Sequence, residues 1–519
     1  MRDRVLLFAK HPAALFPTDV EAQFIRYLSG KPTGDDWLSQ IKPPEPGTII
    51  SFPMQDAEGF TFSMIPARTE NVSDEAFLQR TKEWNRSNRS KPLAIGSGIV
   101  LQATLPNWLA GGANDQSGTG GPGSWPVEAD TQAGSGWAFH VLDKQGIMSG
   151  AATMEGQQDQ VHVAILDTAP TQHAIETAYA EWHWQHPLIE SLLWQNSPLQ
   201  VYPASYADLR GTQDLDLLGH RYIMRDHGLF IAGIIHTLAP QASLHLYEVL
   251  NPYGVGSLET IARGLSKALT DIKGPLIINC SFMFGIPVKG SFDPDFPLPA
   301  DLRDQVADDD MNYSLQDFFN MITGRKDTVV VAAAGNDAHY NNSAAPGTRP
   351  AARFPAAFDK VVGVGALPDA TSAGSGTYTA ATYSNLSDTP APGSYITLGG
   401  EPGPLLGVLG VYIGDFPVYE EPQGCLGFLF GISPRPGHLP RNPRAVIPGR
   451  IKYERNTTGW AWWAGTSFAT PIVTGILAAN HGRPGILDSL TAANAEGLLR
   501  LLQTGQTPEG EKVVPVAQG

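Results

Sequence analysis

The sequence predicts an α/β fold with a mostly parallel central sheet, helices on both faces and right-handed crossover connections. Two short runs, Val161–Leu166 and Val329–Ala334, are mostly apolar, as are strands buried on both faces of a parallel sheet. Between them, Ser257–Leu269 carries apolar residues at helical spacing, which is typical of a crossover helix packed on such a sheet. This alternation of strand and helix indicates an α/β domain.

Each of the two apolar runs leads into a polar residue. Asp167 follows the first run, and Asn336 follows Gly335 after the second. Functional side chains of open α/β sheets gather at the carboxyl ends of the strands, so both residues are expected at that edge. His227 and Ser467 each precede a run of small and apolar residues, which places them at the N-termini of two predicted helices.

An Asp, a His and a Ser placed in this way suit nucleophilic attack on a peptide carbonyl. A serine hydroxyl is a weak nucleophile, so an imidazole must take its proton while a carboxylate holds that imidazole in one tautomer. Asp167, His227 and Ser467 have the side chains for these roles. The amide of Asn336 and the backbone N–H of Ser467 could donate to the developing oxyanion. Taken singly, Ser467 is also a helix N-cap candidate and Asn336 a turn candidate.

Four segments around these residues identify the chain as resembling the subtilisin family (subtilases) of serine proteases. In chain order they are VAILD at 163–167, DHGLFIAG at 226–233, VVVAAAGN at 329–336 and GTSFATP at 465–471. The resemblance extends from about residue 136 to the C-terminus. It implies a subtilisin-like fold and a serine endopeptidase acting on proteins or peptides, with Asp167, His227 and Ser467 as the triad and Asn336 in the oxyanion hole.

Two other function classes stay open beside the endopeptidase. A subtilase that passes its acyl group to an amine would be a peptide ligase or macrocyclase, with the same catalytic residues and a different product. A catalytically silent module could use the same fold to bind peptides, although the four intact motifs argue against it.

The resemblance also implies which residues bind the substrate. One wall of the S1 pocket and the edge that pairs with the substrate backbone correspond to SFMFG at 281–285, so Ser281, Phe282 and Met283 are expected there. Met283 and Phe284 stand where the family often has glycines, and we expect them to narrow the pocket. Asp337, directly after the oxyanion strand, is either a second pocket wall that favours basic side chains or a solvated turn residue.

Composition divides the chain into two parts. Residues 111–123 read GGANDQSGTGGPG, which is typical of a linker. We expect an N-terminal α/β region at 1–110, a linker at 111–135 and the catalytic domain at 136–519. In the N-terminal region we expect a pair of strands at Thr48–Pro53 and Phe60–Ile65 and a further strand at Ile99–Leu105. Helices are expected at Gln23–Leu28 and Ser73–Trp84.

A small α/β region ahead of a subtilase resembles the inhibitory propeptides of that family. This region is therefore a candidate intramolecular inhibitor of the protease. A regulatory or docking domain without inhibitory action is the alternative.

Net charge and composition limit the kinds of partner molecule that we expect. The net charge is 35 − 51 = −16, and no basic cluster is present that could follow a phosphate backbone, so nucleic acid is excluded as an expected partner. Val5–Ala9 is too short for the core of a signal peptide, and no run of eighteen apolar residues occurs. We expect a cytoplasmic protein without a membrane span. The two cysteines, Cys280 and Cys425, are too few for a disulfide framework.

Two segments read as insertions into the protease. His173–Trp194 is rich in aromatic residues and reads as a helix on which His183 and His186 share a face. Because no metal-binding signature accompanies them, a surface or interface helix is expected there in preference to a metal site. Leu405–Asn456 is rich in Gly and Pro and reads as hairpins and loops near the rim of the active site.

No metal or cofactor is expected. The family often carries a calcium-binding loop after the helix that begins at the catalytic histidine. Here IAGIIHTLA at 231–239 runs directly on to the next predicted strand, which leaves no room for that loop.

We therefore predict that stability does not depend on calcium. EDTA should shift the melting temperature little, because a tightly bound ion would contribute several kcal/mol by mass action and its removal would be conspicuous. Differential scanning calorimetry with and without EDTA makes the test. A large drop that added calcium reverses would contradict it.

Overall fold

The computed structural model describes most of the chain. The described residues are 4–30, 37–55, 58–69, 74–96, 98–111, 126–129, 136–142, 147–148, 160–194, 197–205, 209, 223–286, 309–336, 338, 349–368, 378–387, 395–399, 407–419 and 451–518.

A nine-stranded sheet forms the centre of the catalytic domain, with the order β11-β12-β10-β14-β16-β17-β18-β24-β23. Every pairing from β11 to β24 is parallel, and only β23 runs antiparallel. This confirms the predicted α/β fold. The strands are β10 (His162–Asp167), β11 (Leu199–Tyr202), β12 (Ser243–Glu248), β14 (Leu276–Cys280), β16 (Thr328–Ala333), β17 (Val361–Leu367), β18 (Tyr395–Leu398), β23 (Gly505–Gln506) and β24 (Lys512–Val513).

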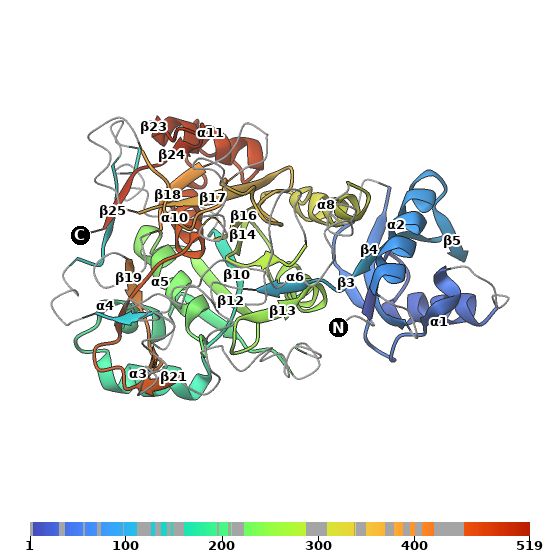
Figure 1. The fold of residues 1–519 in the computed structure, drawn as a ribbon, viewed down its shortest axis with the longest axis horizontal. Helices are drawn as coiled ribbons and strands as arrows, with labels where there is room; N and C mark the ends of the chain where they lie inside the picture. Colours follow the sequence, from blue (N-terminus) through green and yellow to red (C-terminus); the bar gives the residue numbers. More distant parts are fainter. Residues whose placement is uncertain are drawn as a thin grey trace, which may run out of the picture.

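Helices cover both faces of this sheet (Figure 1). On one face α5 (His227–Leu238) packs against α10 (Thr466–Asn480), and α11 (Ala492–Leu502) joins the same apolar core. Every residue of α10 is buried, as expected of a helix that is apolar on all sides. On the other face lie α6 (Leu258–Asp271) and α8 (Asp309–Thr323), and α6 buries the apolar stripe that its sequence predicts.

The N-terminal region has a sheet of its own, with the order β2-β4-β1-β6-β5 and β3 paired to β4. The strands expected around residues 50, 60 and 100 are present, as are both expected helices. The strand β1, which lies between β4 and β6, was not predicted. The elements are β1 (Arg4–Pro12), α1 (Pro17–Ser29), a 3-10 turn (Trp37–Gln40), β2 (Ile41–Lys42), β3 (Ile50–Phe52), β4 (Phe60–Thr69), α2 (Asp74–Ser90), β5 (Leu93–Gly96) and β6 (Ile99–Pro106).

A shared apolar core joins the N-terminal region to the catalytic domain. Figure 1 shows the N-terminal sheet, in blue, beside α6 and α8. One continuous set of buried side chains runs from β1 through these two helices to the central sheet. Phe318 of α8 lies edge-on to Phe8 and Phe52 of the N-terminal sheet, with ring centroids 5.9 and 5.2 Å apart. The N-terminal region is thus packed onto the protease and not merely tethered to it.

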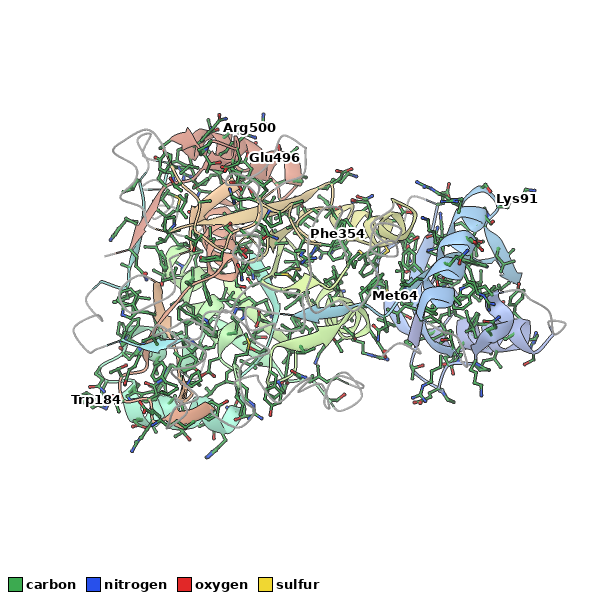
Figure 2. The ribbon with its side chains drawn as sticks, in the orientation of Figure 1. Met64, Lys91, Trp184, Phe354, Glu496 and Arg500 are labelled. Carbon is green, nitrogen blue, oxygen red and sulfur yellow. The ribbon has the colours of Figure 1, made fainter. Side chains whose placement is uncertain are left out.

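The first insertion consists of two short helices, α3 (Gln172–Trp182) and α4 (Pro187–Leu193). The prediction that His183 and His186 share a helix face is wrong, because the chain turns between them and Pro187 begins a new helix. His186 is buried and caps α4: its Nδ1 accepts from the Ile189 N–H at 3.2 Å, and its Nε2 donates to the Gly459 carbonyl at 2.9 Å. Trp184, in contrast, is 70% exposed and projects from the outer edge of the molecule (Figure 2).

In the part that the structure describes, the second insertion contains one antiparallel strand pair, and another of its strands pairs with the segment that follows the insertion. β19 (Val408–Val411) pairs with β22 (Trp460–Trp463), and β20 (Phe416–Tyr419) pairs with β21 (Ile451–Glu454). Residues 420–450 lie outside the described ranges. The remaining short strands are β7 (Leu109–Gly111), β8 (Val127–Glu128), β9 (Phe139–Val141), β13 (Val255–Ser257), β15 (Met283–Phe284) and β25 (Val516–Gln518). Among the described helices, none combines the length and the apolar character that a membrane crossing requires.

We predict that the protein loses stability as the pH falls from about 6.5 to 4. Burial lowers the pKa of His186 to about 4 and that of His245 to about 4. The unfolded chain therefore takes up these protons first, and each neutral histidine contributes stability above pH 6.5 that is lost on the way to pH 4. For His186 alone the loss is at most roughly 3 kcal/mol. Urea unfolding at a series of pH values measures it.

His186→Asn is the control, since asparagine can cap α4 but does not titrate. This variant should be less stable than the parent at pH 7 and should show a flatter dependence on pH. An unchanged pH dependence would exclude His186 as a source of the acid sensitivity.

Candidate active site

Asp167 and His227 form the central contact of the site. Asp167 ends β10, and His227 is the first residue of α5. His227 Nδ1 donates to Asp167 Oδ1 at 2.8 Å, and the Thr168 N–H donates to the same oxygen at 2.7 Å. Both the imidazole and the carboxylate are fully buried. The hydrogen bonds fix the tautomer of His227 and leave Nε2 as its proton-accepting atom.

Gly228 allows α5 to approach β10 this closely. A Cβ atom at Gly228 would lie 2.3 Å from the Thr168 carbonyl oxygen and 3.0 Å from Asp167 Cβ. Backbone oxygen cannot yield to such a contact, so any side chain here would push the helix off the strand. The glycine after the histidine is therefore required by packing.

Aromatic rings enclose His227. The rings of Trp463 and Phe468 lie 5.2 and 5.3 Å from the imidazole, and Phe230 packs against both of them. Within the described part of the chain, His227 Nε2 has no hydrogen-bond partner. The imidazole is thus surrounded by apolar rings.

Ser467 is the second residue of α10 and is 3% exposed. Its hydroxyl donates to the Ser281 carbonyl at 3.2 Å, and the Ser281 hydroxyl donates to the Ser467 carbonyl at 2.9 Å. Among the described residues no hydrogen bond joins Ser467 to His227; the link between the two segments is Phe468, the residue after Ser467, whose ring lies 5.3 Å from the imidazole. Such bonds are often long or absent in enzymes without substrate and tighten in the complex.

Asn336 lies beside the head of α10. Its Oδ1 accepts from the Thr466 N–H at 3.0 Å and from the Thr466 hydroxyl at 2.9 Å. These two donors orient the amide, and among the described residues Nδ2 makes no hydrogen bond. A Cβ atom at Gly465 would lie 3.7 Å from this nitrogen. The amide NH2 group is therefore close to Gly465, the residue at the N-terminus of α10.

The expected substrate-binding edge is paired with a strand of the N-terminal region. β7 lies between β13 and β15 in a small antiparallel sheet, with Gly111 opposite both Val255 and Met283. Phe282 and Phe284 are buried in the core beneath this edge, where Phe284 lies edge-on to Phe319, so Phe284 does not narrow a pocket.

Asp337 falls outside the described residues. The expectation that it forms a wall of the S1 pocket is therefore not addressed by the structure.

Asp226 is a residue of the site that the sequence analysis did not single out. Its Oδ2 accepts from the Ile413 N–H at 3.2 Å and from the Gly414 N–H, so it joins the N-terminus of α5 to the second insertion. Burial raises the pKa of Asp226 to about 6. The sequence places this carboxylate next to His227. Its hydrogen-bond donors, Ile413 and Gly414, lie far along the chain, so no nearby sequence pattern predicts the contact.

Neither a metal centre nor a reactive thiol is evident in the described ranges. Those residues hold no group of three His, Cys, Asp or Glu side chains that could bind a metal ion. Cys280 is a free, buried thiol, and burial raises its pKa well above the usual range. Since only a thiolate is strongly nucleophilic, Cys280 is a packing residue.

A family model and several solved structures match this chain. The model of the Subtilase family matches residues 158–499, which is more than half of the chain. No curated protein matches the sequence. Among solved structures, a lanthipeptide protease is 18% identical over 68% of this chain and 85% of its own, with a TM-score of 0.37.

Two other solved structures are similar. The prenylagaramide maturation protease PagA is 16% identical over 70% of this chain and 90% of its own, with a TM-score of 0.37. A cold-adapted subtilisin-like serine proteinase is 14% identical over 68% of this chain and 88% of its own, with a TM-score of 0.34. On the family match, the chain belongs to the subtilase family of serine proteases.

Proposed function

We propose that the chain is a serine endopeptidase in which Asp167, His227 and Ser467 form the triad and Asn336 stabilises the oxyanion. The observation that carries this proposal is the buried hydrogen bond from His227 Nδ1 to Asp167 Oδ1, which leaves Nε2 as the accepting atom. The packing of α5 against α10 supports it, because the ring of Phe468, the residue after Ser467, lies 5.3 Å from the imidazole of His227.

The chemistry follows from these positions. The Ser467 hydroxyl turns from the Ser281 carbonyl toward His227 and attacks the peptide carbonyl while Nε2 takes its proton. Negative charge on the carbonyl oxygen is met by Asn336 Nδ2 and the Ser467 N–H. His227 then passes the proton to the leaving amine, and water hydrolyses the acyl-enzyme in the reverse sequence. Asp167 stabilises the imidazolium that forms in each half.

We further propose that residues 1–110 restrain the protease. β7 supports this, because it adds a strand between β13 and β15, at the edge where the backbone of a substrate is expected to pair. The segment before β7 is also anchored: Asn107 Oδ1 accepts from the Glu259 N–H at 2.9 Å, and the Trp108 carbonyl accepts from the Leu258 N–H at 2.7 Å. A substrate would have to displace these contacts.

Substitutions in the triad should abolish hydrolysis. Ser467→Ala or His227→Ala should each lower kcat by about 10⁴–10⁶, and Asp167→Ala somewhat less, because the three groups act as a unit. Asn336→Leu should lower kcat by about 10²–10³ with KM nearly unchanged, because the oxyanion forms only in the transition state. Hydrolysis of a fluorogenic peptide library measures both parameters.

Circular dichroism of each variant controls for folding. Full turnover by Asn336→Leu would remove Asn336 from the oxyanion hole. The products should carry free carboxyl groups. Products joined to an added amine would instead favour the ligase or macrocyclase alternative.

Self-cleavage should occur after β7. A segment paired in this way presents the residues that follow it to the nucleophile, so we expect a cut between residues 112 and 125. The Ser467→Ala variant should remain a single chain, because the reaction needs that hydroxyl. Mass spectrometry of the two purified proteins locates the cut and identifies its origin.

Loosening the shared core should activate the protease. Phe318→Ala removes a ring that packs against Phe8 and Phe52, a change that typically costs about 3–5 kcal/mol, whereas Phe318→Leu preserves most of the volume. We expect faster peptide hydrolysis from the alanine variant than from the leucine variant. If the uncut parent already hydrolyses peptides as fast as both variants, the N-terminal region is a docking domain and not an inhibitor.

A further inference from the structure

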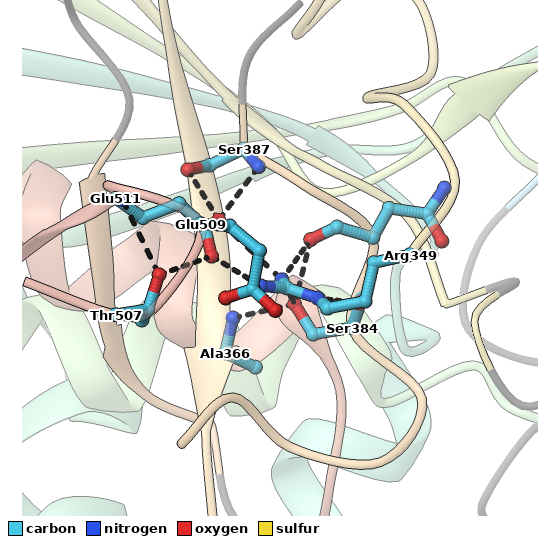
Figure 3. Close-up of polar contacts among 8 residues, drawn as sticks. Arg349, Ala366, Ser384, Ser387, Thr507, Glu509 and Glu511 are labelled. Atoms are coloured by element: carbon cyan, nitrogen blue, oxygen red, sulfur yellow. Dashed lines mark hydrogen bonds and ion pairs between the residues drawn. The ribbon is translucent and has the colours of Figure 1, made fainter. Parts of the chain in front are cut away.

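A buried ion pair joins the end of the chain to a loop near Asn336 (Figure 3). The guanidinium of Arg349 contacts the carboxylate of Glu511, and both side chains are largely buried, with 13% and 2% exposed. Arg349 also donates through Nε to the Ser384 carbonyl at 2.8 Å and through Nη2 to the Asn385 carbonyl at 2.5 Å. A buried charge is tolerated where its hydrogen-bonding groups are met in this way.

Glu511, the acidic partner of Arg349, makes further hydrogen bonds on both sides of the ion pair. Its Oε1 accepts from the N–H and from the hydroxyl of Ser387, each at 2.8 Å. The hydroxyl of Thr507 donates to Oε2 at 3.3 Å. Because Glu511 immediately precedes β24, the ion pair fixes residues 384–387 against the last strand of the central sheet.

The fixed segment in turn holds the backbone that leads into Asn336. The Asn385 N–H donates to the Gly335 carbonyl at 2.9 Å, and its Nδ2 donates to the Ala351 carbonyl at 3.1 Å. Gly335 has φ 111°, and a Cβ atom there would lie 2.7 Å from Asn385 Nδ2. Asn385 and Gly335 are therefore in such close contact that a shift of one moves the other.

We propose that Arg349 and Glu511 are positioning residues for the oxyanion hole, because they hold Asn385 against Gly335 and so fix the placement of Asn336. Neither side chain touches the reacting atoms. The inference rests on the proposed function of Asn336 and goes beyond it. It assigns to the last strand of the sheet a part in the stabilisation of the transition state.

A double-mutant cycle with Asn336 tests the inference in the full chain. Glu511→Gln keeps the shape of the side chain but removes the nearer of the two carboxylate charges that hold Arg349; the other, Glu509 Oε2, lies 3.6 Å from Arg349 Nη1. We expect kcat on a fluorogenic peptide to fall about 3- to 10-fold with KM changed less than about twofold, because a displaced donor weakens only the transition state. In an Asn336→Ala background the same substitution should change kcat less than about twofold.

Two further variants make the result decisive. Ser387→Ala removes only one hydroxyl from Glu511, so it should fold even if Glu511→Gln does not, and it should show a smaller loss that also disappears in the Asn336→Ala background. Arg483→Met is the control, since this partly buried guanidinium binds the Ile147 carbonyl and Asn480 at the opposite end of α10. It should leave kcat unchanged.

Equal losses in both backgrounds, or a change in KM alone, would overturn the inference and leave Glu511 a purely structural residue. The proposed function would stand in that case, provided that Asn336→Ala itself lowers kcat. If Asn336→Ala retained full turnover, the proposed oxyanion role would fail first, and the positioning role with it.

Discussion

The contact between the N-terminus of α5 and the end of β10 is the constraint on which the site depends. Gly228 lets the helix rest directly on the Thr168 carbonyl, and only at this separation does His227 Nδ1 reach Asp167 Oδ1 at 2.8 Å. α10 packs along α5 on the same face of the sheet, and the ring of Phe468, next to the proposed nucleophile Ser467, lies 5.3 Å from the imidazole of His227. The candidate site residues thus lie at the carboxyl ends of parallel strands and at the N-termini of the helices packed on them.

The N-terminal region uses a different kind of contact. It is held by a continuous apolar core through α6 and α8, while β7 pairs with β13 and β15 through backbone hydrogen bonds and buries Ala110 in the same core. Apolar packing supplies most of the free energy of docking, and it does not depend on what occupies the cleft. On our proposal that β7 occupies the place of a substrate, a substrate strand of similar pairing energy would replace it while the rest of the region stays attached.

The sequence predicted the parts of the molecule that have local signals. Apolar runs and the amphipathic spacing of α6 predicted the sheet and its covering helices, and four short motifs predicted Asp167, His227, Ser467 and Asn336 as the candidate site. The strand β1 was missed because Val5–Ala9 was considered only as a signal-peptide core, whereas its burial depends on partners far along the chain. The pairing of Gly111 with Val255 and Met283 could not be read from a glycine-rich segment, since backbone pairing leaves no side-chain pattern.

The orientation of individual side chains could not be predicted from the sequence either. The motif places a histidine and a serine at two helix N-termini, but only the structure reveals that the Ser467 hydroxyl donates to the Ser281 carbonyl. Likewise, the spacing of His186 indicated a helix face shared with His183, whereas in the structure His186 is buried and caps a helix. Both outcomes depend on acceptors that lie far away in the sequence.

Reaction with a fluorophosphonate, followed by peptide mapping, tests the central claim most directly. Such a probe phosphonylates a serine only where a base and an oxyanion hole activate it. The account predicts one adduct, on Ser467, whose formation is lost in the His227→Ala variant. An adduct on another residue, or labelling of Ser467 at the same rate without His227, would contradict the assignment of this site.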